Sequence, residues 1–113
     1  MTTYLVTGGA GFIGSHLADA LLAAGHRVLA VDDLSTGSLD NVAHLENNPN
    51  FHLARASITD DVVMDRLASQ SDIIVHLAAA VGVQLIVEHP VHTIETNVMG
   101  TEAVLKSALR YGC

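Results

Sequence analysis

The topology of this chain of 113 residues is set by YLVTGGAGFIGSHL, at residues 4–17. Its first four residues, Tyr4 to Thr7, predict a short strand, and a glycine-rich turn follows at once. Apolar residues then recur on one face of a predicted helix, namely Ile13, Leu17, Leu21 and Ala24. Gly25 is expected to end that helix, because glycine adopts the left-handed conformation without strain.

The spacing of three glycines gives this turn a chemical interpretation. Gly8 allows a sharp turn off the strand, Gly11 lets backbone amides approach a pyrophosphate, and Gly14 lets the helix pack closely. The helix N-terminus supplies unpaired N–H groups and a positive dipole end. Asp32 ends a second predicted strand, residues 27–32, and can accept the hydroxyls of a ribose. We therefore predict a dinucleotide site. The alternative is a glycine turn in an unrelated α/β protein.

The composition narrows the class of protein. Half of the residues are hydrophobic and tryptophan is absent, which suits a parallel sheet buried on both faces. A net charge of −7 without a Lys/Arg cluster argues against nucleic acid. No apolar run reaches membrane-spanning length, and Met1 leads into the first strand without a basic signal region, so we expect a cytoplasmic protein.

A metal site is not expected. Cys113 is the only cysteine, so neither a disulfide nor a thiolate site can form within the chain. The seven histidines are scattered over different predicted elements. Only His89 and His92 have ligand-like spacing, and Pro90 between them starts a predicted helix.

The rest of the chain continues the alternation of strands and helices. We expect a short helix over 39–46 capped by Ser38, a strand over 51–56, a helix over 60–69 capped by Thr59, and a strand over 73–77. A small-residue turn over 78–83 precedes a long helix over 90–111 that Gly112 ends. The expected apolar face of that helix consists of Val91, Ile94, Val98, Val104, Leu105 and Leu109.

This order predicts the α/β class. Right-handed crossovers would give a Rossmann-type doubly wound parallel sheet of strand order 3-2-1-4, truncated before a fifth strand. We expect residues 1–113 to be part of one such domain, with no second domain.

Four motifs in order resemble the NAD-dependent epimerase/dehydratase family of extended short-chain dehydrogenases/reductases. They are TGGAGFIG at 7–14, VDDLSTG at 31–37, VHLAA at 75–79 and TNVMGT at 96–101. The resemblance is to the N-terminal part of the family, covers essentially the whole chain, and is nearest to proteins of the UDP-glucose 4-epimerase type. It implies NAD as the cofactor and a nucleotide sugar as the substrate of the full-length protein.

The resemblance also implies roles for individual residues. The pyrophosphate would be lined by Gly8, Gly11, Phe12, Ile13 and Gly14. Asp32 would hold the adenosine ribose, and Asp33, Ser35, Thr36 and Gly37 would lie around the adenine end, which Ser57 and Ile58 flank. Leu77, Ala78 and Ala79 would approach the nicotinamide side, with Asn97 behind the cofactor.

Two positions depart from the family. An acid often stands where Ser57 lies and bonds the adenine amino group, whereas serine can do so only through its hydroxyl. Val81 replaces a lysine that some epimerases carry near the nicotinamide, so that contact is expected to be absent. We predict NAD over NADP, because a 2′-phosphate would meet Asp32 and Asp33 as like charges and neither adjoining loop contains Arg or Lys.

The family's catalytic pair, Tyr-x-x-x-Lys, is not found in these residues. Neither Tyr4 nor Tyr111 has a lysine four residues later, and Lys106 is the only lysine. We therefore assign no catalytic residue. We expect the chain to be the NAD-binding portion of a longer nucleotide-sugar epimerase or dehydratase and to be inactive alone. The exposed last strand is expected to pair with another chain, as a homodimer or in another association. The alternatives are a non-catalytic dinucleotide-binding module or NAD sensor and, less favoured, another Rossmann reductase.

Overall fold

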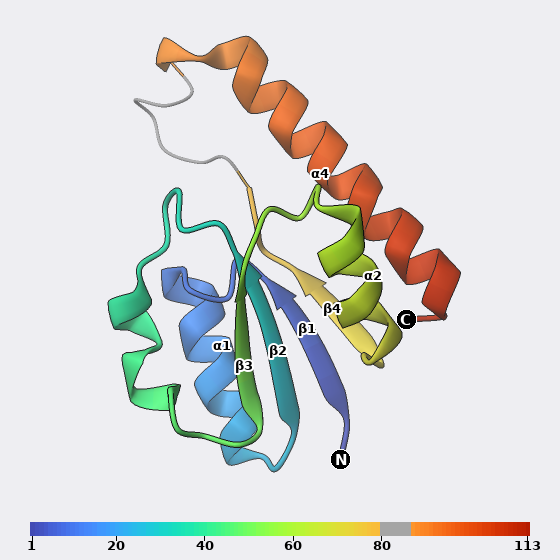
Figure 1. Ribbon diagram of the computed structural model, residues 1–113. Coiled ribbons are helices and arrows are strands. Elements are labelled where there is room, and N and C mark those ends of the chain that lie inside the picture. Colours follow the sequence, from blue (N-terminus) through green and yellow to red (C-terminus); the bar gives the residue numbers. More distant parts are fainter. Residues whose placement is uncertain (80–86) are drawn as a thin grey trace.

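A computed structural model describes residues 1–79 and 87–113 of the chain (Figure 1). Four strands form one sheet: β1 (Thr3–Thr7), β2 (Arg27–Asp32), β3 (Phe51–Arg55) and β4 (Ile73–His76). Their order is β3-β2-β1-β4 and every neighbouring pair is parallel. This is the strand order predicted from the sequence, and it places β4 at an edge of the described sheet.

Helices cover both faces of the sheet (Figure 1). The α1 helix (Phe12–Ala23) lies on one face, whereas α2 (Asp61–Ser69) and α4 (Pro90–Tyr111) lie on the other. Two short 3-10 helices, η1 (Leu39–Asn41) and η2 (Ala43–Leu45), lie beside α1. The crossovers between parallel strands thus build the layered α/β arrangement expected for a doubly wound sheet.

Side chains that alternate along the two central strands form two cores. Leu5, Leu29 and Val31 pack with residues of α2 and with Val104 of α4. Val6 and Val28 point to the opposite face, where they pack with Ala18 of α1, with Val42 between η1 and η2, and with Leu45 of η2. Since a strand alternates its side chains between faces, one apolar run supplies both layers.

Most predicted boundaries agree with the structure within one residue, and Gly25 and Gly112 end their helices with φ of +88° and +70°. Two local predictions were wrong. The single helix expected over 39–46 is divided into η1 and η2, although Ser38 does accept the Asp40 N–H as predicted. Asp60, not Thr59, caps α2 by accepting the Val63 N–H at 3.2 Å, because the helix begins one residue later than expected.

The predicted apolar faces of two helices were also wrong in part. In α4, of the six expected residues only Val104 is buried, and the buried face also contains Thr93, Gly100 and Ser107. In α1, Leu17 and Leu21 pack against the core as predicted, but the buried residues are Gly14, Ser15 and Ala18, and Ile13 and Ala24 are exposed. Small side chains let both helices approach their neighbours closely, and that proximity outweighs hydrophobic periodicity.

The expected turn over 78–83 falls outside the described residues from position 80 onward, as does Val81. Within the described chain, no helix is both long and apolar enough to cross a membrane.

Candidate functional site

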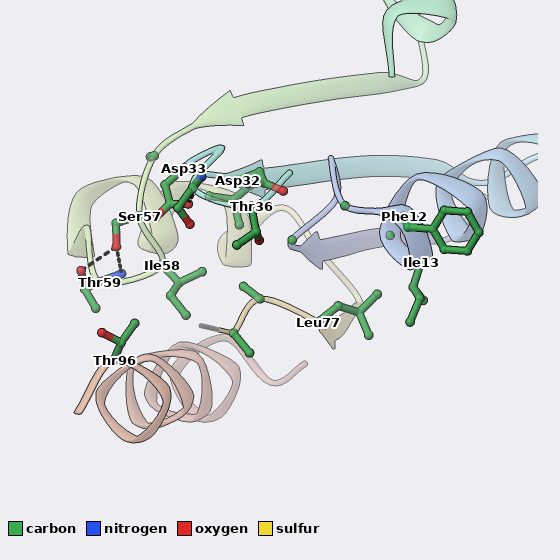
Figure 2. A pocket seen from close by; sticks show the side chains of 18 residues that line it. Phe12, Ile13, Asp32, Asp33, Thr36, Ser57, Ile58, Thr59, Leu77 and Thr96 are labelled. Carbon is green, nitrogen blue, oxygen red and sulfur yellow. Dashed lines mark hydrogen bonds between the residues drawn. The ribbon is translucent and has the colours of Figure 1, made fainter. Parts of the chain in front are cut away.

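A cleft of about 410 Å³ opens at the carboxyl ends of the strands (Figure 2). It lies where the chain order reverses, since β2 and β4 flank β1 on opposite sides, and open α/β sheets bind ligands at this switch point. Every site residue expected from the sequence lines this cleft except Gly37 and Asn97. Four residues that were not expected also line it: Val31, Ala56, Thr59 and Thr96.

The glycine turn forms one wall of the cleft. Gly8 has φ +72°, donates its N–H to Val31 O at 2.8 Å, and lies so close to Ala78 that a Cβ would be 3.0 Å from the Ala78 nitrogen. A Cβ at Gly14 would overlap the carbonyl oxygen of Gly8. Gly14 therefore holds α1 against the turn itself, which is a closer contact than the helix-to-sheet packing that the spacing suggested.

The N-terminus of α1 is left open toward the cleft. Its N-cap is Gly11, which has no side chain to bond the first N–H groups, and the first turn contains no acid. The unpaired N–H groups and the positive end of the helix dipole are thus available to an anion. Phe12 and Ile13 are 75% and 68% exposed at this end, so their apolar side chains border the same opening (Figure 2).

Asp32 is a buried carboxylate at the end of β2, with 7% of its surface exposed. Its Oδ2 accepts the Ala10 N–H at 3.0 Å and its Oδ1 accepts the Leu34 N–H at 2.8 Å. Each carboxylate oxygen can accept a second hydrogen bond. The two N–H groups therefore hold the side chain in place and still leave each oxygen able to accept from a ligand.

Gly37 supports Asp32 from behind instead of lining the cleft. A Cβ at Gly37 would lie 2.8 Å from Asp32 Oδ2 and 3.0 Å from the Ala10 carbonyl oxygen. The loop after β2 is further held to the glycine turn, because Ser38 N–H and Asn41 Nδ2 both donate to the Ala10 carbonyl. The DDLSTG segment therefore has two roles: some of its residues line the cleft, and Gly37 packs against Asp32 and the glycine turn.

Two hydroxyls lie at the end of the cleft next to α2 (Figure 2). Ser57 Oγ accepts the Thr59 N–H at 3.1 Å and lies 2.7 Å from Thr59 Oγ1. Thr59 was missed as a site residue; its signal in the sequence was a serine two positions earlier, because Ser and Thr commonly bond the backbone two residues on. Ile58 lies between them and contacts α4, where a Cβ at Gly100 would be 2.5 Å from Ile58 Cδ1.

A chain of hydrogen bonds joins β1, β4 and α4 beneath the cleft. Thr7 Oγ1 accepts the N–H groups of Leu77 and Ala78 at 2.9 and 3.1 Å, so its own hydrogen points to His76 Nδ1 at 2.7 Å. His76 is thereby the Nε2–H tautomer, which faces Thr101 Oγ1 at 3.3 Å. Burial lowers the pKa of the imidazole below its ordinary value of 6.5. The prediction that His76 is a hydrogen-bonded packing residue agrees with these contacts.

The α4 helix contributes Thr96 to the cleft, whereas Asn97 is half-buried and borders a shallow hollow along α4. Asn97 was expected behind the cofactor, and that role stays a prediction.

The electrostatic character of the cleft comes from two carboxylates. Asp32 and Asp33 are its only charged lining residues among those the structure describes, and no Lys, Arg or His joins them. Within residues 1–79 and 87–113 there is also no group of three or more His, Cys, Asp or Glu placed to hold a metal ion.

These features fit a dinucleotide. The open helix N-terminus suits a pyrophosphate, because backbone N–H groups and a dipole replace cationic side chains there. The buried carboxylate at the end of the neighbouring strand suits a ribose diol. Gly8 and Gly14 lack the Cβ atoms that would meet the backbone of Ala78 and of Gly8, so the turn folds tightly beside the open helix N-terminus.

Comparison with known proteins gives a consistent result. The family model described as GDP-mannose 4,6 dehydratase matches residues 5–113. UDP-glucuronic acid decarboxylase 4 from Arabidopsis thaliana is 44% identical over 108 residues, and UDP-glucose 4-epimerase from Mycolicibacterium smegmatis is 43% identical over 105 residues. These alignments cover 96% and 92% of this chain but only 23% and 34% of the two relatives.

Solved structures show the same relationship. A dTDP-glucose 4,6-dehydratase from Streptomyces venezuelae, crystallised with NAD bound, superposes with a TM-score of 0.91 at 35% identity. A UDP-glucose 4-epimerase from Thermotoga maritima, crystallised with UDP-glucose, gives a TM-score of 0.86 at 38% identity. Each superposition covers 98% of this chain, and 37% and 35% of the respective structures.

Proposed function

Since the chain belongs to the NAD-dependent epimerase/dehydratase family, we propose that it is the NAD-binding part of an enzyme acting on a nucleotide sugar. One observation carries the proposal: the uncapped N-terminus of α1 and the buried carboxylate of Asp32 face the same cleft. The first suits a pyrophosphate and the second suits the adenosine ribose, in the order in which a dinucleotide presents them.

The proposed cofactor is NAD and not NADP. A 2′-phosphate would lie against Asp32, which is buried and already held by Ala10 and Leu34 N–H groups. The described residues of the lining include no cation to offset that repulsion, so binding the phosphate would force two like charges together in a poorly solvated place.

The residues of this chain bind and orient the cofactor but do not carry the reaction. NAD, when bound, takes a hydride from the substrate and returns it. Thr7 and His76 hold the Leu77–Ala79 segment in place at the nicotinamide side through the two N–H groups that Thr7 accepts. No Tyr-x-x-x-Lys pair occurs in the 113 residues, so the acid–base step is assigned to residues outside them.

The relatives are named as epimerases, dehydratases and decarboxylases, so the proposal stays at the level of that class. The cytoplasmic location and the homodimer expected from the sequence stay predictions.

Calorimetric titration tests the proposal directly. NAD should bind the 113-residue chain, NADP should bind at least about tenfold more weakly, and Asp32→Ala should abolish measurable NAD binding. Asp40→Ala, which removes an exposed carboxylate of η1 outside the cleft lining, is the matched control and should bind within about threefold of the parent. A chain that is folded by circular dichroism but binds neither dinucleotide contradicts the proposal.

A second candidate function is a non-catalytic NAD-binding module or sensor, favoured by the combination of a complete cofactor cleft with the missing Tyr-x-x-x-Lys pair. The coding sequence following Cys113 separates the two. A Tyr-x-x-x-Lys pair in frame supports the enzyme, and its absence supports the module.

A further inference from the structure

The base end of the cleft is lined by a pair of hydroxyls that can exchange their hydrogen-bonding roles. We call Ser57 and Thr59 the hydroxyl pair. Both side chains are exposed to the cleft, and their oxygens lie 2.7 Å apart (Figure 2). One further bond is fixed in direction, because the Thr59 N–H donates to Ser57 Oγ at 3.1 Å. Either hydroxyl can be the donor in the bond between them.

Counting hydrogens and lone pairs shows what the pair offers a ligand. If Ser57 donates to Thr59, Ser57 keeps one lone pair as an acceptor and the hydrogen of Thr59 is available as a donor. If Thr59 donates to Ser57, both lone pairs of Ser57 are used, its hydrogen becomes the donor, and Thr59 becomes the acceptor. The pair therefore always presents a donor on one residue and an acceptor on the other, and rotating two O–H bonds exchanges their positions.

The position of the pair assigns it to the purine of a dinucleotide; this step rests on the proposed function. Asp32 ends β2, and Ser57 follows the end of β3, the strand that pairs with β2. A base attached to the ribose at Asp32 thus extends toward the loop that contains the pair, past Ile58.

The Watson–Crick edges of purines differ in the order of their donors and acceptors. A 6-amino purine has an amino donor beside the ring acceptor N1, and a 6-oxo purine has a carbonyl acceptor beside an N1–H donor. An ionised carboxylate facing the 6-position would accept from the amino group but repel the carbonyl, whereas the hydroxyl pair can match both orders. We propose that this site binds 6-amino and 6-oxo purine dinucleotides with similar affinity.

One nearby group would oppose this tolerance. Asp33 lines the same end of the cleft and can only accept, although its Oδ1 is bonded to the Ser35 N–H at 3.0 Å. If Asp33 rather than the hydroxyl pair contacts the base, the amino purine will be preferred. The experiment must therefore be able to detect that preference.

Parallel calorimetric titrations with NAD and nicotinamide hypoxanthine dinucleotide provide the test. For the parent chain we expect the two Kd values to agree within about threefold. Ser57→Asp places an acceptor-only group in the pair and should favour NAD by about tenfold, which is the effect of one charge-assisted hydrogen bond. Ser57→Ala is the control, and it should weaken both ligands while keeping their ratio below about threefold.

The outcomes separate the inference from the proposed function. If NAD binds but the hypoxanthine dinucleotide binds at least about tenfold more weakly to the parent, the tolerance is disproved. It is also disproved if Ser57→Asp leaves the ratio unchanged. If neither ligand binds a chain that is folded by circular dichroism, the proposed function itself fails.

Discussion

The two halves of the sheet differ in how completely they are enclosed. Five of the six residues of β2 are buried, whereas β4 has none buried and Ile73 is 42% exposed. Both strands are apolar, so their composition does not distinguish them. What differs is their surroundings, because β2 has a strand on each side and β4 pairs only with β1 among the described residues. The cleft lies across this boundary, since it is lined by Asp32 at the end of β2 on the enclosed half and by Leu77 and Ala78 after β4 on the open half.

The largest effect is expected from replacing a glycine by alanine, and one such glycine is available on each side of this boundary. Gly14→Ala would drive a Cβ into the backbone oxygen of Gly8, which cannot yield without opening the turn. We expect a loss of about 3 kcal/mol or more in unfolding free energy, measured by urea denaturation, and no detectable NAD binding. Gly100→Ala is the matched change on the open half, where the Cβ meets only the end of the Ile58 side chain at 2.5 Å.

Gly100→Ala should cost less than about 1 kcal/mol, since alanine favours the helix and Ile58 can change rotamer. NAD affinity should fall only a few-fold. Equal losses of unfolding free energy for the two variants would show that the turn and α4 are equally rigid. That result would contradict the difference expected between the enclosed and open halves.

The sequence predicted the strands and the topology more accurately than the contacts of the helices. The β2 boundaries, the strand order and the glycine turn agree with the structure because apolar runs, glycine spacing and right-handed crossovers are local or topological signals. The limits of α4 were also predicted, since Pro90 and Gly112 mark them. The buried face of α4 was not, because Gly100 and Ser107 make its contacts and small residues give no signal in hydrophobic periodicity.

The site residues follow the same division. Most of the motif residues assigned to the site line the cleft, although Val31 and Thr96, which also lie on motifs, were not expected there. Thr59 and the packing role of Gly37 were not predicted either. Each depends on how one loop lies against another, which a linear pattern does not contain.

Leucine truncation measures the difference in packing between the halves. Leu5 on β1 is fully buried and Leu109 on α4 is 87% exposed. We expect Leu5→Ala to lower the unfolding free energy by about 3 kcal/mol through lost burial and a residual cavity. Leu109→Ala should change it by less than about 0.5 kcal/mol. A loss of about 2 kcal/mol or more at Leu109, which is the effect of truncating a buried leucine, would mean that another surface covers that face of α4 in solution.

His76 links the two halves through its contacts with Thr7 on β1 and Thr101 on α4. The pH dependence of the unfolding free energy tests the contribution of this link. Because burial lowers the His76 pKa, the folded chain binds fewer protons than the unfolded chain. Stability is therefore fully present above about pH 6.5, the ordinary value, and is lost as the pH falls through the lowered pKa. The side chain is only partly buried, so we expect less than about 1 kcal/mol.

Urea denaturation from about pH 8 to pH 5 should show this decline in the parent chain, and His76→Asn should reduce its slope. Asparagine can still accept from Thr7 but does not titrate in this range. An identical slope in the two proteins would assign the decline to the other histidines.

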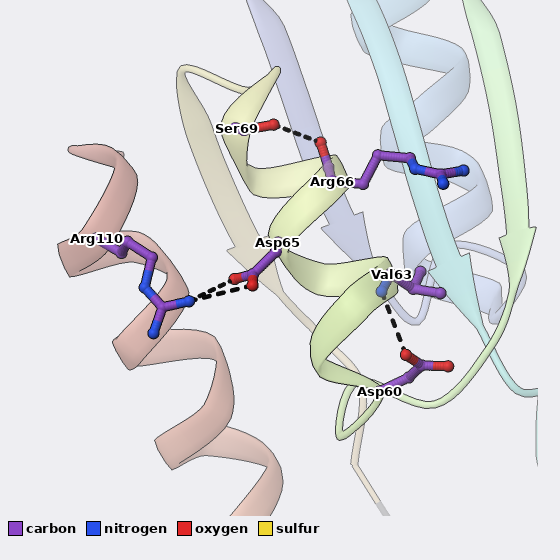
Figure 3. Close-up of polar contacts among 6 residues, drawn as sticks. All are labelled: Asp60, Val63, Asp65, Arg66, Ser69 and Arg110. Carbon is purple, nitrogen blue, oxygen red and sulfur yellow. Dashed lines mark hydrogen bonds and ion pairs between the residues drawn. The ribbon is translucent and has the colours of Figure 1, made fainter.

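The smallest effect is expected where α4 meets α2 at the surface (Figure 3). Arg110 Nη1 lies 2.9 Å from Asp65 Oδ1 and 3.1 Å from Oδ2, and the two side chains are 61% and 38% exposed, respectively. Asp65→Asn should therefore cost only about 0.5 kcal/mol, and less in about 1 M salt, where the charges are screened.

Glu102→Gln, which breaks the Glu102–Lys106 pair at 3.0 Å within α4, is the control for losing an ion pair that does not join two helices. If Asp65→Asn costs no more than this control, α4 is held to the sheet by Val104 and its small-residue face rather than by charge. A loss several times that of the control would instead make the ion pair the main contact of the open half.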